Sequence, residues 1–208
     1  MSGLPVQITG APLRTVRPKT LRGVYANPEK ELVRWRDTGR LVQIARGTYI
    51  AKPDHVAPGR DWWPRLETAA VAYATAVYGD RVPVLFGLGA ARFHHAIPRA
   101  INVTVVAVPA SHRVVPLLTG GRIVFTVRLT SGLDARPEGT ELGPALVTTP
   151  EQTLIDLVRY PGLGGLPAEA AAAARVLRDH VDGARLAGLL ERVPATVRRQ
   201  VATTLGEA

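Results

Sequence analysis

One stretch of the chain constrains its fold more than any other. Residues 31–53 read ELVRWRDTGRLVQIARGTYIAKP, a basic amphipathic run that stops at Gly39 and is followed at once by two short β-prone runs around Arg46 and Gly47. Glycine takes the positive φ that a tight hairpin requires, and it also suits the left-handed end of a helix. The stretch therefore predicts a charged helix beside a tight, arginine-tipped hairpin.

The predicted helix has a clear beginning and an inward face. Asn27 is a good N-cap, and Pro28 suits the first helical position, where its missing N–H costs nothing. Leu32 and Trp35 lie three residues apart, so we expect them, with the neighbouring Val33, to face a core. The sequence thus predicts an amphipathic helix that starts at residue 28.

A shorter helix is expected just before it. Residues 18–25, PKTLRGVY, read as helical with Leu21, Val24 and Tyr25 pointing inward, and a break follows before the longer helix. The order short helix, turn, helix, hairpin is that of a winged helix-turn-helix. A major groove about 12 Å wide accepts one helix, and the hairpin beside it can reach flanking phosphates.

Positive charge is concentrated in this N-terminal part. Residues 1–58 hold ten Lys and Arg against four Asp and Glu, net +6, whereas residues 59–208 hold sixteen against thirteen, net +3. A nucleic-acid site concentrates cations because neutralising phosphates releases counterions. We therefore predict binding to double-stranded DNA through a surface that comprises Arg17, Lys19, Thr20, Arg22, Lys30, Arg34 and Arg46.

A simpler interpretation of the same residues stays open. Lys30 and Arg34 share one helical stripe, but three acids, Glu29, Glu31 and Asp37, lie close enough to balance them. The stripe would then be a solvated face and the hairpin an ordinary surface turn. Helix-turn-helix folds also serve as protein-binding modules.

The remaining chain predicts a second, larger domain. The stretch 53–64, PDHVAPGRDWWP, suits a connection, so we expect an N-terminal domain of residues 1–58 and a second domain of residues 59–208. Trp62 and Trp63 are expected to dock this connection onto the second domain, with base stacking as the alternative. An α+β fold is predicted for this domain from the order of its expected elements. These are a helix over residues 64–78, strands in INVTVVAVP and GRIVFTVRL, and helices after Thr149, Pro167 and Asp182 and around Val197.

The chain offers little for catalysis or metal binding. It contains no cysteine, which removes thiol chemistry and thiolate ligands. Adjacent side chains on a helix diverge by about 100°, so His94 and His95 predict one buried and one exposed ring instead of a shared metal site. A two-metal site would need a second acidic side chain two residues after Asp134, but that residue is Arg136. The pair of carboxylates that holds two metal ions is therefore missing. We expect no cofactor, no metal and no enzymatic activity.

Two motifs resemble a known family. The chain resembles AbiEi-type antitoxins of type IV toxin-antitoxin systems in its winged helix ending in RGTYIA and in the segment GLGAARFHH, a sheet and the segment LVTTPEQTLIDLVRY that follow it. The residues that carry the resemblance best are Arg46, Gly47, Tyr49, Thr149, Pro150, Glu151, Thr153 and Asp156. The resemblance implies a winged helix that represses its own promoter and a C-terminal domain that counteracts a nucleotidyltransferase-like toxin, with direct contact left open. From the residues alone, Thr153 and Asp156 are expected to satisfy backbone groups across a core. The N-terminal VQITGAPLRTVRP has two prolines and a glycine, which predicts an abbreviated first helix.

Two other functions stay open beside the antitoxin. One is a winged-helix transcriptional regulator whose second domain senses a ligand, and the other is an enzyme with a DNA-binding arm, which the missing catalytic set disfavours. No stretch approaches the ~18 to 20 apolar residues of a membrane span. We expect a cytoplasmic protein that has no membrane partner and is a monomer in solution. Arg198 and Arg199 beside Val197 and Val201 predict a basic rim on an apolar stripe, suited to an acidic partner.

Overall fold

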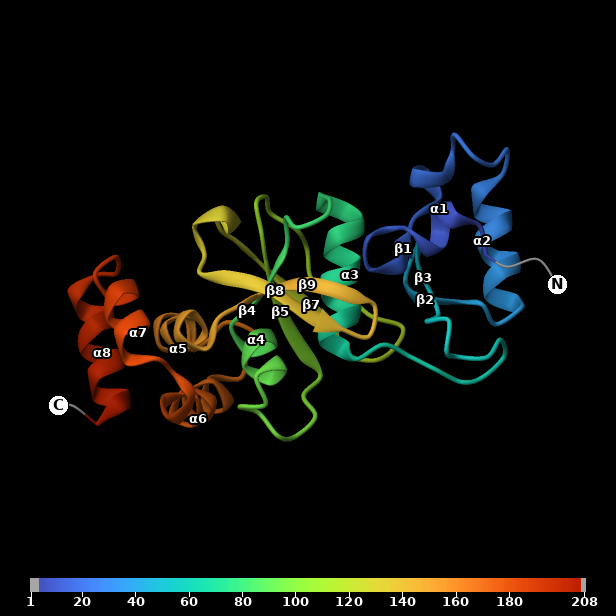
Figure 1. Ribbon diagram of the computed structural model, residues 1–208. Helices are drawn as coiled ribbons and strands as arrows, with labels where there is room; N and C mark the ends of the chain where they lie inside the picture. The colour runs from blue at the N-terminus through green and yellow to red at the C-terminus, as the bar shows by residue number, and fades with distance from the viewer. Residues whose placement is uncertain (1–3, 207–208) are drawn as a thin grey trace.

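The protein has an α+β fold, as predicted, with its parts arranged along one long axis (Figure 1). The structure is a computed structural model that describes residues 4–206, so the first three residues of the predicted first domain and the last two of the second lie outside it. A small three-stranded sheet with helices forms one end. A six-stranded mixed sheet occupies the middle, and the C-terminal helices form the other end.

The N-terminal unit has the element order of a winged helix. Its strands pair antiparallel in the order β1-β3-β2, and its small core contains Ile8, Leu32, Leu41 and Tyr49. The expected abbreviated first helix is α1, only four residues long. The elements are α1 (Val6–Thr9), η1 (Pro12–Arg14), β1 (Thr15–Val16), η2 (Pro18–Leu21), α2 (Pro28–Asp37), β2 (Leu41–Ala45) and β3 (Thr48–Ala51).

The helix expected over residues 18–25 is shorter than predicted. Only the 3-10 turn η2 forms, and Leu21 is its buried residue. Val24 was expected to point inward but is 45% exposed, while Tyr25 packs partly against the small core. Glycine at position 23 weakens a helix here, and Pro28 disfavours helical backbone at Asn27, the residue before it. The chain therefore forms a turn instead of a longer helix.

The larger unit is built on a sheet of order β6-β7-β5-β4-β9-β8. β5 runs parallel to β7 and β4 parallel to β9, and the other neighbouring pairs are antiparallel. Its elements are α3 (Leu66–Tyr78), β4 (Val84–Phe86), α4 (Leu88–Phe93), β5 (Val103–Val108), β6 (Val115–Pro116), β7 (Arg122–Val127), η3 (Thr130–Gly132), β8 (Ala135–Thr140), β9 (Gly143–Thr148), α5 (Pro150–Arg159), α6 (Pro167–Leu177), η4 (Arg178–His180), α7 (Gly183–Leu190) and α8 (Ala195–Leu205).

The two faces of this sheet bury different helices. One face, with Leu85 and Val106, packs against α3, and the other, with Phe86 and Val105, packs against α4, α5 and α6. α4 approaches β5 so closely that a Cβ at Gly89 would lie 2.5 Å from Thr104 Oγ1 and 2.8 Å from Val105 O. Glycine is therefore required at this point of the GLGAAR segment.

α3 lies between the large sheet and the N-terminal unit (Figure 1), and the two units share one hydrophobic core. Ile44 and Ile50 of the hairpin belong to the same buried cluster as Ala69 and Tyr73 of α3. In addition, Leu118 N donates to Ile44 O at 2.8 Å, which joins β2 to the loop after β6. The boundary near residue 58 stays a prediction, but residues 59–208 alone would expose the α3 face that this core covers.

The connection between the units docks through one of its two tryptophans. Trp62 packs partly buried against the shared core, as expected, whereas Trp63 is 49% exposed. The end of α2 lies against the same connection. Gly39 has φ +71, and a Cβ there would lie 2.6 Å from Gly59 N, so glycine is needed both for backbone conformation and for space.

The C-terminal helices differ from the prediction in one respect. Val197 and Val201 of α8 are buried in the core with α5 and α6, so they do not form an exposed apolar stripe beside Arg198 and Arg199. α8 has to pack this face because α5 and α6 leave apolar surface uncovered. Within residues 4–206, no helix is long and apolar enough to cross a membrane.

Candidate nucleic-acid interface

The candidate interface is formed by η2, the turn after it, and α2. Asn27 Oδ1 accepts a hydrogen bond from Lys30 N at 3.1 Å, and Pro28 occupies the first turn, which fixes the start of α2 as the sequence predicted. Leu32 is fully buried and Trp35 partly buried, so this face holds the helix on the small core. The opposite face is left free to meet a partner.

Of the five predicted DNA-binding cations on α2, on η2 and next to η2, four have no ion pair within residues 4–206: Arg17, Lys19, Arg22 and Lys30. Lys19, Arg22 and Lys30 are exposed, whereas Arg17 is half-buried at the start of η2. η2 packs beside α2, so these cations lie on adjoining elements. Their charge is available to phosphates because no carboxylate of the described chain neutralises it.

The remaining two predicted residues of this surface already have partners. Thr20 Oγ1 donates to Arg17 O at 2.8 Å and accepts from Arg17 N at 3.3 Å, which closes the η2 turn. Arg34 is exposed but forms an ion pair with Glu31 at 3.0 Å, and its guanidinium lies 4.8 Å from the centre of the Trp35 ring. Of the three acidic residues that the sequence offered to neutralise this stripe, Glu31 therefore pairs with Arg34.

Arg46 lies apart from this group. It is exposed at the tip of the predicted hairpin, where Gly47 adopts φ +65. The strands beside it are buried, and Ile44 and Ala45 belong to the core shared with α3. The structure therefore brings η2 and α2 together, but it places Arg46 on a hairpin that packs against the larger unit.

A hollow at the other end of α2 was not predicted from the sequence. It has a volume of about 400 Å³ and lies between α2, β2 and the connection, with Arg36, Lys52, Arg60, Trp62, Trp63 and Leu118 in its lining. Arg36 Nη1 donates to Gln43 Oε1 at 3.2 Å, and Lys52 Nζ donates to Arg60 O at 2.5 Å. The adjacent tryptophans after a Pro- and Gly-rich stretch were the only signal in the sequence.

The Thr-Pro-Glu motif at the start of α5 is a fold-organising network. Thr149 Oγ1 accepts from Gln152 N at 3.3 Å and donates to Asp134 Oδ2 at 2.8 Å. Asp134 also receives two hydrogen bonds from Arg185, at 2.8 and 2.7 Å, and these hydrogen bonds lower the pKa of its carboxyl. Glu151 Oε1 accepts from Asp182 N at 2.8 Å. The motif thus clamps α7 to α5.

Thr153 and Asp156 of the same motif behave differently. Thr153 Oγ1 donates to Thr148 O at 3.2 Å, as expected of a residue that satisfies backbone groups. For Asp156 the expectation is wrong: Oδ1 accepts from the side chain of Gln152 at 2.9 Å, and Oδ2 has no hydrogen-bond partner in the described chain. Gln152 lies one helical turn before Asp156, so its side-chain amide bonds this carboxyl in place of a backbone group. Burial raises the pKa of Asp156 well above its ordinary value.

The two histidines differ in exposure as predicted, although His94 is half-buried and not fully buried. His94 is half-buried with Nε2 2.7 Å from Thr148 O, and burial lowers the pKa of its imidazole. His95 is exposed and has φ 61. No group of three or more His, Asp or Glu within residues 4–206 could hold a metal ion.

Comparison with known proteins shows a shared fold. No protein-family model matches the chain, and no curated protein does. Among solved structures, the chain is similar to the crystal structure of the RV2827C protein from Mycobacterium tuberculosis, with a TM-score of 0.58 and 18% sequence identity, over 100% of this chain and 78% of that one. At this identity the likeness concerns the fold alone.

Proposed function

We propose that the protein is the antitoxin of a type IV toxin-antitoxin system. Its N-terminal winged helix binds the promoter DNA of its own operon and represses it, and its larger unit counteracts a nucleotidyltransferase-like toxin encoded alongside. The observation that carries the DNA-binding part is the set of uncompensated cations on η2 and α2. The antitoxin part rests on the motif resemblance around Arg46 and Thr149.

The geometry of the N-terminal unit supports binding in the major groove. A helix of ten residues, such as α2, fits the groove with its exposed face toward the bases, while η2 lies toward the phosphates. Lys30 is exposed on α2, and Lys19 and Arg22 extend from η2 and its turn. Each phosphate that they neutralise adds about 0.9 to the slope of affinity against salt on logarithmic axes.

The larger unit supports a binding role in preference to catalysis. Its most connected polar residues, Asp134, Glu151 and Arg185, hold helices to one another. We therefore propose no enzymatic activity and no cofactor, and a monomer that acts in the cytoplasm on DNA and on its toxin.

A second candidate function is a transcriptional regulator that senses a small ligand. The hollow of about 400 Å³ between α2 and the connection favours it, because a ligand held by Trp62 and Trp63 would touch both units. A nucleotidyltransferase gene next to this one would favour the antitoxin, and its absence would favour the regulator.

The DNA-binding part is tested by charge reversal in the full-length chain. We expect Lys30→Glu with Arg34→Glu to weaken binding to the DNA upstream of its own gene by at least about 30-fold, since each contact contributes about 1–3 kcal/mol. Fluorescence anisotropy measures the affinity. The matched control is Arg198→Glu with Arg199→Glu, the same charge change on exposed residues of α8, at the opposite end of the molecule.

Equal binding by the α2 double variant and the parent would rule out this interface. Equal loss in the α8 control would show that net charge alone drives the binding. Repression of a reporter by the same promoter provides the corresponding readout in cells.

A further inference from the structure

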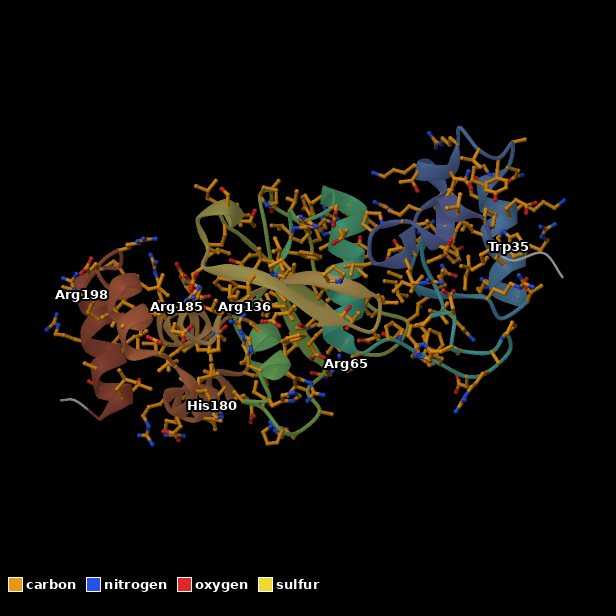
Figure 2. All side chains as sticks on the ribbon, viewed as in Figure 1. Trp35, Arg65, Arg136, His180, Arg185 and Arg198 are labelled. Atoms are coloured by element: carbon orange, nitrogen blue, oxygen red, sulfur yellow. The ribbon has the colours of Figure 1, made fainter. Side chains whose placement is uncertain are left out.

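Another hollow, of about 320 Å³, lies in the larger unit at the start of α3. Arg65, Glu67 and Thr68 line it from α3 and its N-cap, while Phe93 and His95 line it from the end of α4 and the loop that follows. α3 and α4 contact each other, and Figure 2 shows Arg65 at the lower end of α3. A hollow of this size is at the lower end of the range for small-molecule sites.

Glu67 brings a buried carboxylate to this hollow. Its side chain is 8% exposed, and Oε1 lies 2.9 Å from Arg92 Nε. This ion pair does not have hydrogen-bond geometry, and no hydrogen bond reaches Oε1 within residues 4–206. A buried polar atom without a hydrogen bond is rare in native proteins, so Oε1 is available to a donor from outside the described chain. Because a carboxylate is nearly two-fold about its last torsion, Glu67 can turn either oxygen toward the hollow that it lines.

Two guanidinium groups in the lining keep N–H donors for an anion. Arg65 Nε and Nη2 donate to Glu141 Oε2 at 3.3 and 3.1 Å. Arg92 turns its Nε toward Glu67 and donates from Nη1 to Arg99 O. Each guanidinium carries five N–H donors, so Arg65 and Arg92 both have donors left for a phosphate group.

These groups together require a ligand that has both an anionic group and a hydrogen-bond donor. The two guanidinium groups are balanced by the carboxylates of Glu67 and Glu141, so, with His95 neutral, the lining and its ion-pair partners carry no net charge. A simple anion would be attracted by the guanidinium groups and repelled by Glu67. A sugar phosphate satisfies both, because its phosphate accepts from guanidinium and its hydroxyls donate to a carboxylate, as ribose does in dinucleotide sites.

We propose that the hollow at the start of α3 binds a ribose phosphate, either free or as part of a nucleotide. Its phosphate lies between Arg65 and Arg92, and its 2′-hydroxyl donates to Glu67. Phe93 and Pro98 supply apolar surface beside it. The site lies apart from the hollow between α2 and the connection, and it does not rest on the antitoxin function.

Calorimetric titration of the full-length chain tests the ligand. We expect ribose 5-phosphate and AMP to bind with a Kd below about 1 mM. Inorganic phosphate, and 2′-deoxy-AMP relative to AMP, should bind at least about 10-fold more weakly, because neither can donate to Glu67 from a 2′-hydroxyl. Tighter binding of AMP than of ribose 5-phosphate would assign the site to a nucleotide, and equal binding would assign it to a free sugar phosphate.

Two substitutions assign the binding to these side chains. Glu67→Gln should lower the preference for AMP over 2′-deoxy-AMP at least about 3-fold, since a hydrogen bond to a neutral amide is weaker than one to a carboxylate. Arg65→Gln should weaken the binding of both phosphates about 2- to 5-fold, because this side chain is 59% exposed and its charge is screened. The matched control is Arg113→Gln, which removes the same charge from an exposed residue outside the hollow and should leave affinity unchanged.

Thermal unfolding shows whether each variant is folded at the temperature of the titration. If Glu67→Gln does not fold, the comparison of AMP with 2′-deoxy-AMP on the parent chain and the Arg65→Gln result decide between the outcomes.

Four results would overturn the proposal. The parent chain would bind neither ribose 5-phosphate nor AMP up to about 10 mM, which would leave Glu67 and Arg92 as a structural ion pair. Inorganic phosphate would bind as tightly as ribose 5-phosphate, or 2′-deoxy-AMP as tightly as AMP, which would exclude the sugar contact. Arg65→Gln and Arg113→Gln would lose affinity equally, which would show an effect of net charge alone. None of these titrations contains DNA or toxin, so each result would leave the proposed antitoxin function in place.

Discussion

The η2–α2 surface and the start of α5 use charged residues in opposite ways. On η2 and α2, Lys19, Arg22 and Lys30 are exposed and meet no carboxylate within residues 4–206. At the start of α5, Asp134 and Arg185 are joined by two hydrogen bonds and tie helices together. The η2–α2 surface thus leaves its charge for a partner, whereas the start of α5 uses its charge in the fold.

This difference shows why the surroundings of a charged residue must be known before it can be assigned a role. Glu151 is buried and accepts from Asp182 N, so its carboxylate is consumed by the structure. The backbone N–H of Lys30 takes part in the cap of α2, and its ammonium forms no ion pair with the described residues. We therefore expect changes at α5 to alter stability and changes at α2 to alter DNA affinity.

The largest expected effect is in the core beneath α5. Leu154 is fully buried, so Leu154→Ala should lower the free energy of unfolding by about 2–5 kcal/mol. Urea denaturation measures this loss. Among molecules that stay folded, DNA affinity should be unchanged, and a loss of affinity beyond the unfolded fraction would contradict the separation of the two regions.

The hairpin tip tests how far the DNA surface extends. If Arg46 contacts DNA, Arg46→Glu should weaken binding by about 1–3 kcal/mol without a change in stability, because the side chain is exposed. Anisotropy and thermal unfolding are measured together. Unchanged affinity would restrict the interface to η2 and α2, in line with the burial of the strands beside the tip.

Asp156 provides an effect of opposite sign. Its second oxygen is buried and has no hydrogen-bond partner among residues 4–206, so Asp156→Asn should stabilise the protein by roughly 1 kcal/mol at pH 7. Because burial raises its folded-state pKa, this carboxyl favours the folded state fully below its unfolded pKa and loses that contribution as pH rises toward the folded pKa. The gain from asparagine should therefore shrink as pH falls toward 4. A gain that does not depend on pH would contradict this assignment.

Asp134 should show a smaller effect with the reverse pH dependence. Hydrogen bonds from Arg185 lower its folded-state pKa, so its contribution to stability is present above the unfolded pKa and is lost as pH falls through the folded pKa. Asp134→Asn should cost under about 1 kcal/mol at pH 7, since the side chain of Arg185 is 48% exposed and its interaction is screened by solvent. Urea midpoints from pH 7 to pH 3 should fall more steeply for the parent than for the variant, and parallel curves would argue against this role.

Much of the fold follows from local sequence. Asn27 and Pro28 begin α2 where capping chemistry predicts, and Gly47 supplies the positive φ of the hairpin. The strands predicted in INVTVVAVP and GRIVFTVRL are confirmed as β5 and β7. They could be predicted because β-branched residues favour a strand locally. β8 was not predicted from the sequence, because its ARPEGT is poor in β-formers and becomes a strand through its pairing with β9.

The candidate site was predictable in its charge and less so in its geometry. The basic residues of η2 and α2 could be read from the charge distribution, because charge needs no tertiary contact to be counted. The position of Arg46 could not be predicted from the sequence, since the hairpin packs against α3, which is more than ten residues away in the chain. Likewise, the burial of Val197 and Val201 depends on where α5 and α6 leave apolar surface.

The central claim is that the free cations of η2 and α2 bind phosphates, and the salt dependence of DNA affinity tests it most directly. We expect glutamine at Lys19, Arg22 and Lys30 together to reduce the slope of log affinity against log salt by about 2.7, at about 0.9 per contact. Glutamine at Arg192, Arg198 and Arg199, which removes the same charge from the other end of the molecule, should leave the slope unchanged. An unchanged slope in the first variant, or an equal reduction in both, would contradict the account.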